Sequence, residues 1–296
     1  MAEPRVLVVG DLLYDMLAKA DGGLTLGTDT FAPIRVAAGG SGANAAAWLA
    51  RAGVETHFAG RVGDDAFGGF LEGEMGRAGV TAHLARDPSR ATGKVFVLVD
   101  GAGERTMITD RGAGEALAPG DLPERLFPGG HLHLSGYTLS GGSRRETAKG
   151  ALRLARAAGM TVSVDPSSVP LLRSVGPGRF LGWTGGADLL FPNLAEGEAL
   201  TGERNPDRIL RKLLDHFPAA VLKLGPGGAA YADAGGKKAR VPAAPARVED
   251  TTGAGDAFSA GFLAAWLDDE PPEEALRRGA ETAALAVGRV GARPGA

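Results

Sequence analysis

The sequence of 296 residues contains no cysteine. This excludes a disulfide scaffold, a thiol nucleophile and a zinc or iron–sulfur site with Cys ligands. Basic residues are not clustered: 32 Lys and Arg are scattered among 35 Asp and Glu, so nucleic-acid binding is not expected. No apolar stretch approaches the ~20 residues that cross a bilayer, and no signal-peptide core follows Met1. We therefore expect a cytoplasmic protein without a membrane segment.

The hydrophobic pattern that is present is typical of an α/β protein. Short runs of Val, Leu and Ile alternate with longer amphipathic stretches, as expected when parallel strands are covered by helices on both faces. We expect strands of this kind at 6–9, 56–59, 131–134, 161–164, 188–191 and 221–224. No shift in composition marks a second domain, so we expect a single domain over residues 1–296.

Two segments, about 12–37 and 94–112, break this alternation. Residues 95–109 read as two strands around a turn that contains glycine, which is typical of a hairpin. The first segment has apolar residues separated by glycine and aspartate, and it could supply two more strands. We therefore expect a small β-sheet that acts as a lid.

A glycine turn opens a helix near the C-terminus. Gly253 and Gly255 flank Ala254, and the apolar residues after Asp256 follow helical spacing. Free amides and the positive end of the helix dipole bind anions, and glycine lets a phosphate approach. We expect the dipole to keep Asp256 ionised, so that it can accept the proton of an attacking hydroxyl beside this anion hole. The alternative is that Asp256 only complements the dipole.

A second glycine cluster, residues 37–53, also runs into a helix. Gly40, Gly42 and Ala45 match the dinucleotide-binding pattern G-x-G-x-x-A, which requires a buried strand before it and an acidic residue about 20 positions later. Pro33 precedes the cluster, and proline disfavours a central strand. Because the pattern itself is present, a dinucleotide-binding oxidoreductase stays an alternative from a different class of enzyme.

Six ordered motifs resemble those of the PfkB, or ribokinase-like, family of carbohydrate kinases. They are VGD (9–11), GGSGAN (39–44), GRVGDDAFG (60–68), PNLAE (192–196), KLGPGG (223–228) and DTTGAGDAF (250–258). The resemblance covers nearly the whole chain. It implies a three-layer αβα core with a mostly parallel central sheet and a small β-sheet lid, and transfer of the γ-phosphoryl group of ATP to a sugar-like hydroxyl.

The resemblance also implies roles for single residues. Asp256 matches the catalytic base, and the backbone of Gly253, Ala254 and Gly255 matches its anion hole. The residues that match the acceptor site are Asp11, Gly39, Gly40 and Asn44. The two glycines match a hinge that lets the lid move, although an ordinary flexible loop is the alternative. Asp11 follows the first expected strand, where open α/β sheets bind ligands, but it could also bond its own turn.

On the nucleotide side, the resemblance points to Asn193, Lys223, Gly225 and Gly228. Glu196 matches a residue that places Mg²⁺, an ion that keeps several waters in its coordination shell. Asn193 followed by Glu196 is also a helix-capping box, and Lys223 could be an ordinary exposed residue at a strand end. Asp250 and Thr252, with the backbone around 287–291, resemble the monovalent-cation loop of some members, which implies K⁺.

Three further features bear on the acceptor and on metals. Ser41 stands where ribokinases usually carry lysine, which weakens the expectation of ribose as the acceptor. The lid segment carries Arg105 and Arg111, and arginine can bind a carboxylate bidentately, as a keto-deoxy sugar acid would require. His131 and His133 alternate along a strand with no third ligand in sight, so we expect them to be structural.

The sequence thus predicts an ATP- and Mg²⁺-dependent sugar kinase, with a homodimer formed through the lid as one arrangement. Within kinases the alternative is a nucleoside kinase of adenosine type. A sugar sensor without catalysis is a third alternative, against which the retained Asp256 and the paired glycines argue.

Overall fold

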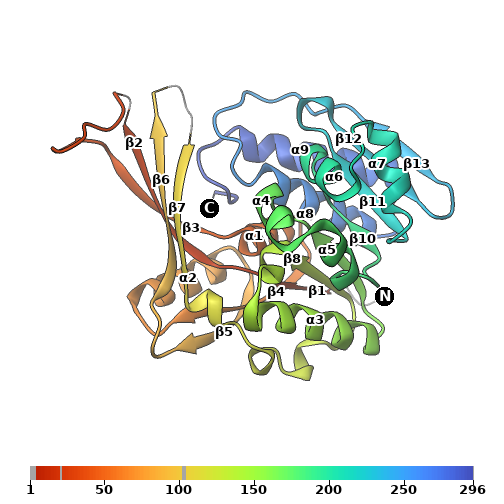
Figure 1. Cartoon of the computed structure of the whole chain (residues 1–296), viewed down its shortest axis with the longest axis horizontal. Coiled ribbons are helices and arrows are strands. Elements are labelled where there is room, and N and C mark those ends of the chain that lie inside the picture. The colour runs from red at the N-terminus through yellow and green to blue at the C-terminus, as the bar shows by residue number, and fades with distance from the viewer. Residues whose placement is uncertain (1–4, 21, 102–104, 296) are drawn as a thin grey trace.

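The computed structural model describes residues 5–20, 22–101 and 105–295, which form two β-sheets with helices packed around the larger one (Figure 1). The strands are β1 (Arg5–Val9), β2 (Leu13–Ala20), β3 (Ile34–Gly39), β4 (Glu55–Gly63), β5 (Thr81–Asp87), β6 (Thr92–Asp100), β7 (Arg105–Gly112), β8 (His131–Ser135), β9 (Thr161–Asp165), β10 (Leu189–Leu190), β11 (Ala219–Lys223), β12 (Ala229–Asp233) and β13 (Lys238–Val241). The helices are α1 (Ser41–Arg51), α2 (Ala66–Arg77), α3 (Gly142–Ala157), α4 (Val169–Val175), α5 (Pro177–Trp183), α6 (Leu194–Thr201), α7 (Pro206–Leu213), α8 (Ala254–Leu267) and α9 (Pro272–Val287).

The large sheet has the order β13-β12-β11-β10-β9-β8-β1-β4-β5 and is parallel from β11 to β5. The centre of the sheet is apolar on both faces. In β1 all four residues from Val6 to Val9 are buried, and because side chains on both faces are buried, the hydrophobic run is continuous rather than alternating. The edge strands β5 and β13 were not predicted, because half-exposed strands lack such a run, and β12 was not predicted because alanine occupies three of its five positions. Conversely, β10 has only two residues, fewer than expected.

Helices cover both faces of the large sheet. Leu7 and Leu132 belong to the core cluster on the face of α3 to α7, and Val6 and Val8 belong to the cluster on the face of α1, α2, α8 and α9. The three-layer αβα architecture is thereby confirmed. Within the ranges that the structure describes, no helix is long and apolar enough to cross a membrane.

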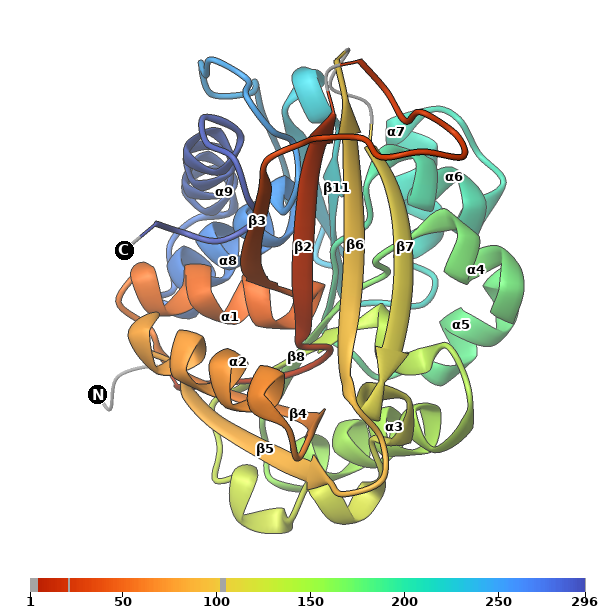
Figure 2. The same cartoon turned by 90° about the vertical axis from the view of Figure 1, so that its left-hand side faces the viewer.

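The second sheet, called the lid sheet below, has the order β3-β2-β6-β7 and stands beside the helical layers (Figure 2). Its strands come from the two segments that break the α/β alternation. β2 pairs antiparallel with β3 and parallel with β6, and β6 pairs antiparallel with β7. Leu13, Val95 and Val97 form a small core on its inner face.

A glycine with a positive φ angle precedes each of the helices α1 and α8. Gly40 precedes α1 with φ 97°, and Gly253 precedes α8 with φ 73°. Other residues adopt such angles at a cost, whereas glycine does so freely. Space also demands glycine: a Cβ on Gly40 would collide with the Asp11 carbonyl, and one on Gly253 would lie 2.6 Å from the Ala292 carbonyl.

Candidate active site

A cavity of about 770 Å³ lies between the inner face of the lid sheet and the carboxyl ends of β9 and β11. Its wall includes every site residue expected from the sequence except Gly39. These residues are Asp11, Gly40, Asn44, Asn193, Glu196, Lys223, Gly225, Gly228, Asp250, Thr252, Gly253, Ala254, Gly255 and Asp256. Residues from five of the six motifs therefore line one cavity, and the motif at 60–68 lies outside its wall.

Asp256 lies in the first turn of α8, and both of its carboxylate oxygens accept hydrogen bonds from α1. Ser41 Oγ donates to Oδ1 at 2.8 Å, and Asn44 Nδ2 donates to Oδ2 at 3.0 Å. Burial, reinforced by the charge of Asp165, raises the pKa of Asp256 to about 7 although these bonds and Lys223 act against it. The expectation that the dipole keeps this carboxyl ionised is therefore wrong at neutral pH, because desolvation outweighs the dipole.

This raised pKa matters for chemistry. A general base works best when its pKa is close to the working pH, since it is then ionised in part and still accepts a proton readily. The amides of the first helical turn have no intrahelical acceptor. The Ala254 amide donates to the Thr251 carbonyl at 3.3 Å, and Ala254 and Gly255 line the cavity together with Asp256. A carboxyl and a helix start that favours anions therefore lie side by side.

Lys223, at the end of β11, pairs with Asp165, at the end of β9. Lys223 Nζ lies 2.6 Å from Asp165 Oδ2, and both side chains are about nine-tenths buried, with 11% and 7% exposed. Ser259 Oγ donates to the same oxygen at 3.2 Å. A Cβ on Gly255 would lie 3.4 Å from Lys223 Nζ, so the ammonium rests against the first turn of α8. Lys223 is thus not the exposed strand-end residue of the alternative interpretation.

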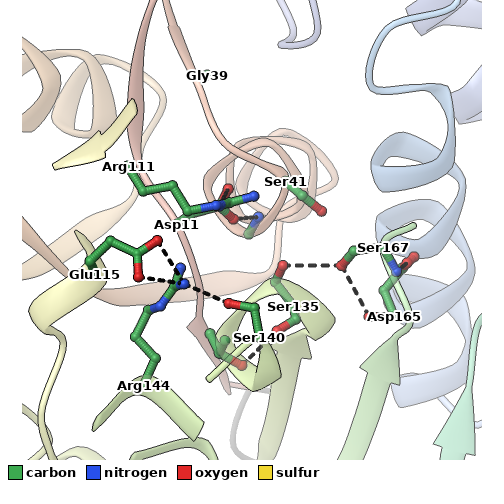
Figure 3. Close-up of polar contacts among 12 residues, drawn as sticks. Asp11, Gly39, Ser41, Arg111, Glu115, Ser135, Ser140, Arg144, Asp165 and Ser167 are labelled. Carbon is green, nitrogen blue, oxygen red and sulfur yellow. Dashed lines mark hydrogen bonds and ion pairs between the residues drawn. The ribbon is translucent and has the colours of Figure 1, made fainter. Parts of the chain in front are cut away.

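Asp165 was missed by the sequence analysis. Its signal was available, because it directly follows the expected strand 161–164 and the carboxyl ends of such strands bind ligands. Asp165 Oδ1 accepts a hydrogen bond from the Ser167 amide at 2.9 Å, and Ser167 Oγ lies 3.3 Å from Ser135 Oγ (Figure 3). The carboxylate is therefore held from both sides at the edge of the sheet.

Asn193 and Glu196 form the capping box at the start of α6. Asn193 Oδ1 accepts from the Glu196 amide, and Glu196 Oε2 accepts from the Asn193 amide, both at 2.9 Å. Glu196 is 3% exposed, and burial together with Asp165 raises its pKa to about 7, against the effect of Lys223. The capping role is confirmed, and the same carboxyl also lies on the cavity wall.

At the lid end, Asp11 pairs with Arg111 of β7. Arg111 Nη1 lies 3.4 Å from Asp11 Oδ2, and the guanidinium lies 4.3 Å from the centre of the Tyr137 ring (Figure 3). The structure therefore places Arg111 on the wall of the cavity, beside Asp11. The side chain of Arg105 lies outside the described part of the chain.

Asp15 was also missed, although it is the only carboxylate on the inner face of β2 among the described residues. Burial raises the pKa of Asp15 to about 7 despite nearby Arg293, and its Oδ1 is buried without a hydrogen-bond partner. A Cβ on Gly39 would collide with this carboxylate. Gly39 is therefore required by close packing on Asp15, which a merely flexible loop would not need.

The dinucleotide-binding pattern has the wrong context. The strand before Gly40 is β3, which lies at the edge of the lid sheet and is half exposed at its start. The pattern requires a buried parallel strand there. The glycines instead serve the close approach of α1 to Asp11.

The far end of the cavity is lined by the loop after β11 and by α9. Gly228, with φ 84°, lies where a Cβ would collide with the Val241 carbonyl, whereas Gly225, with φ 56°, has open space around it. Asp250 Oδ1 accepts from the Thr252 amide and hydroxyl at 2.8 and 2.6 Å, and Oδ2 accepts from the Gly291 amide at 3.0 Å. Asp250 therefore ties the loop before α8 to the segment after α9.

No group of three or more His, Asp or Glu residues within the described ranges could hold a metal ion. His131 and His133 are buried and both lie within hydrogen-bond distance of Ser163 Oγ, at 2.7 and 2.8 Å. These contacts agree with the structural role expected for the two histidines.

Comparison with known proteins identifies the family. A model described as "pfkB family carbohydrate kinase" matches residues 3–296. The chain is 34% identical to the ATP-dependent ribose-1-phosphate kinase of Halopiger xanaduensis, over 98% of this chain and 94% of the relative. The fold matches adenosine kinase from Sinorhizobium meliloti with a TM-score of 0.89 and 27% identity, over 99% of this chain and 96% of that one. It matches Arabidopsis thaliana ribokinase complexed with ribose and ATP with a TM-score of 0.82 and 27% identity, over 99% and 95%.

The match spans the whole described chain, and five of the six motifs that suggested it meet around one cavity. The chain therefore belongs to the pfkB family of carbohydrate kinases, and it is a phosphotransferase that acts on a sugar hydroxyl.

Proposed function

We propose that the protein transfers the γ-phosphoryl group of ATP to a hydroxyl of a small carbohydrate, with Asp256 as the catalytic base. One observation supports this above all. A carboxyl with a pKa near 7 lies at the start of α8, beside first-turn amides and the ammonium of Lys223, on the wall of a cavity that extends to the lid sheet. The proposed base, the proposed anion hole and the space for the acceptor therefore lie next to one another.

In the proposed reaction, Asp256 accepts the proton of the acceptor hydroxyl as its oxygen attacks the γ-phosphorus in line. The bond from the γ-phosphorus to the bridging oxygen breaks, and ADP takes up the electron pair. The amides of Ala254 and Gly255 and the ammonium of Lys223 stabilise the charge on the transferred group. The proton then leaves Asp256 for solvent. Closure of the lid sheet would exclude the water that otherwise hydrolyses ATP.

The acceptor side of the proposal rests on polar groups at the lid end. Asp11 and Asp15 are acceptors for sugar hydroxyls, and the unpaired Oδ1 of Asp15 needs such a donor. Asn44 lies on the same wall, and Gly40 leaves room for the sugar at the hinge. Arg111 supplies a positive charge beside them, which favours an acceptor with an anionic group.

The nucleotide would occupy the other end. Alanine and valine side chains line it, including Ala243, Ala246, Val248, Ala283 and Val287. Gly225 and Gly228 would let the phosphates approach the chain closely, and Asn193, which pairs with Lys223, lines the same cavity. An apolar slot next to a phosphate-binding helix start suits a nucleotide.

Mg²⁺ fits the residues present. The buried carboxyl of Glu196 lies on the cavity wall with a raised pKa, so a cation beside it would favour its ionised form. Mg²⁺ usually binds one or two carboxylates together with waters and substrate phosphates. Glu196 would hold the hydrated ion, which supplies charge neutralisation on the phosphates when bound. For K⁺, the loop of Asp250 and Thr252 stays a prediction, because the contacts that the structure gives Asp250 are to its own chain.

The acceptor is identified by a panel of ribose 1-phosphate, ribose, fructose, 2-keto-3-deoxygluconate and adenosine, read by ADP release in the presence of ATP and Mg²⁺. We expect turnover with a sugar or sugar acid and little with adenosine. Turnover with adenosine alone would favour the nucleoside-kinase alternative, which the likeness to the Sinorhizobium meliloti enzyme supports. Binding of ATP with no turnover of any member would contradict the kinase proposal.

We also propose a homodimer through the outer face of the lid sheet. Val36, Met16, Phe96 and Ile108 are directly paired across all four strands and form one apolar row on that face. Val36 and Ile108 are 50% and 69% exposed. Ile108→Glu should shift the protein to monomer in light scattering. A wild type that is monomeric at micromolar concentration would contradict this proposal.

A further inference from the structure

Arg293 reaches from the segment after α9 into the acceptor site. Its Nη2 donates to the Gly39 carbonyl at 3.1 Å, and its Nε donates to Asn44 Oδ1 at 3.2 Å. One side chain thus contacts the hinge at the end of β3 and the first helical turn of α1. Neither the motifs nor the composition of the sequence singled out this residue.

The segment that carries Arg293 is fixed by contacts of its own. The Trp48 indole donates to the Ala292 carbonyl at 3.0 Å, and the Gly291 amide donates to Asp250 at 3.0 Å. Gly253, at the start of α8, packs so closely on Ala292 that a Cβ there would lie 2.6 to 2.8 Å from it. Arg293 therefore approaches Asn44 from a well-anchored backbone.

Arg293 determines which end of the Asn44 amide faces Asp256. The oxygen and nitrogen of an asparagine amide have nearly the same shape, and their orientation follows from hydrogen bonding. Since Arg293 donates to Oδ1, the Nδ2 group is directed to Asp256 Oδ2, to which it donates at 3.0 Å. The reversed amide would place an oxygen against the carboxylate and an N–H against the guanidinium, and both contacts would be repulsive.

The positive charge of Arg293 also interacts with three nearby carboxylates, those of Asp15, Asp256 and Asp11. Burial lowers the pKa of Arg293 to about 10, and Asp15, Asp256 and Asp11 oppose this effect. Other charges are already engaged: Arg111 pairs with Asp11, and Lys223 pairs with Asp165. Arg293 Nη1 is buried without a hydrogen-bond partner, so its charge is offset by nearby carboxylates rather than by a direct pair.

We propose that Arg293 is a positioning residue for catalysis, which orients the Asn44 amide so that Asp256 is held ready to accept the acceptor's proton. This inference rests on the proposed role of Asp256. It adds a residue that touches neither the acceptor nor ATP and acts through Asn44.

The orientation itself is tested without any substrate. The chain has three asparagines, Asn44, Asn193 and Asn205, so labelling asparagine with ¹⁵N yields three side-chain amide signals. Arg293→Gln should shift the Asn44 signal and speed its hydrogen exchange, and should leave the other two unchanged. The matched control is Arg289→Gln, which removes an arginine of the same segment that stacks on Trp48, with the guanidinium 5.9 Å from the ring centre. It should leave all three signals in place.

Kinetics test the consequence. With the acceptor of the panel that turns over fastest, Arg293→Gln should lower kcat by about 10- to 100-fold, the effect of a misplaced catalytic group, while KM for ATP stays within about twofold. In an Asn44→Ala background the same substitution should cost less than about twofold more, because residues that act through one another are not additive. The acid limb of the pH profile should move to higher pH in Arg293→Gln and stay in place in Arg293→Lys, which keeps the charge.

A purely structural role has a different signature. It would lower the melting temperature and the amount of active enzyme, but leave kcat per active site and the acid limb unchanged. If Arg293→Gln fails to fold, the cycle with Asn44→Ala is run with Arg293→Lys, whose single nitrogen does not reproduce the planar two-nitrogen geometry with which Arg293 binds Asn44 and Gly39. An unmoved Asn44 signal, or equal effects of the substitution with and without Asn44, overturns the inference. An inactive wild type or a fully active Asp256→Asn would instead contradict the proposed function, and the NMR result would still decide the orientation.

Discussion

Lys223 Nζ and Asp165 Oδ2 lie 2.6 Å apart at the carboxyl ends of β11 and β9, although 58 residues separate them in the chain. β10 runs between these two strands, so the pair spans three neighbouring strand ends. The Asp165 carboxylate also accepts a hydrogen bond from Ser259 of α8, and its negative charge helps to raise the pKa of Asp256. The pair therefore connects the carboxyl ends of the sheet strands to helix α8.

Breaking this pair from one side should destabilise the protein. Asp165→Asn or Lys223→Met leaves a buried charge without its partner, which typically costs about 3–5 kcal/mol. The double variant should recover part of this loss, because neither charge remains. Urea unfolding measures all three, with Lys149→Met as a control, since the exposed pair of Lys149 with Glu146 is worth less than about 1 kcal/mol. Single variants as stable as the wild type would contradict the burial of the Lys223–Asp165 ion pair away from water.

Removing the carboxylate of Asp256 should abolish most of the activity. Asp256→Asn keeps the shape of the side chain but cannot accept a proton, so kcat should fall by about 10²–10⁴-fold. Binding of ATP, measured by calorimetry, should change little, because no contact of the nucleotide depends on proton transfer. Asp268→Asn makes the same substitution at the exposed end of α8 and should be neutral. A fully active Asp256→Asn variant would refute the assignment of Asp256 as the catalytic base.

The pH dependence of activity should follow Asp256. Burial raises its pKa to about 7, and only the ionised form accepts a proton. Below that pH, kcat/KM should therefore fall about tenfold per pH unit, as for a single base in the free enzyme. A profile that stays flat down to pH 5 would mean that the carboxyl is ionised throughout. Measurements at fixed ionic strength from pH 5 to 9 decide the point.

The raised pKa of Asp256 also affects the stability of the fold: activity should rise with pH, whereas the stabilising effect of this group should fall. The folded state binds the Asp256 proton more tightly than the unfolded state, whose pKa is near 3.8, so this group stabilises the fold at low pH and loses that effect as pH rises toward 7. Asp256→Asn removes the titration. Its free energy of unfolding should therefore increase relative to the wild type between pH 5 and pH 8. A difference that does not vary with pH would contradict the raised pKa.

Two glycines of one loop should differ in tolerance. Gly228→Ala puts a Cβ into the Val241 carbonyl at a φ of 84°, so we expect it to destabilise the protein by several kcal/mol or prevent folding. Gly225→Ala meets no atom within 4 Å and should cost only about 1–2 kcal/mol for its positive φ. Thermal unfolding of both variants compares them directly. Equal effects would show that sterics do not distinguish the two positions.

The central strands and both glycine-rich helix starts could be predicted because their signals are local. A run such as Val6 to Val9 is apolar throughout only in a strand buried on both faces, and glycine pairs before a helix mark a close approach. The edge strands β5 and β13 were missed since solvent accepts polar residues along them, and β12 was missed because its buried residues are mostly alanine rather than Val, Leu or Ile. The two residues of β10 were overestimated because the flanking apolar residues are buried outside any strand.

Most of the site residues could be predicted through their motifs, whereas Asp15 and Arg293 lie outside every motif. Ser41 lies in a motif and Asp165 follows an expected strand, but their contacts could not be predicted. The partners are far away in the chain: Asp256 for Ser41, Lys223 for Asp165 and Asn44 for Arg293. A pattern of neighbouring residues contains no information on such distances. The capping box of Asn193 and Glu196, by contrast, is local and was visible.

By itself, the amino-acid sequence determined the layered α/β architecture, the family and the two helix starts, because hydrophobic periodicity and glycine spacing act over a few residues. Only the tertiary structure decided that Asp256 has a pKa near 7, that Lys223 is paired and that Arg293 orients Asn44. Those properties depend on burial and on charges that meet across the sheet, and desolvation exists only once the chain has closed around the group.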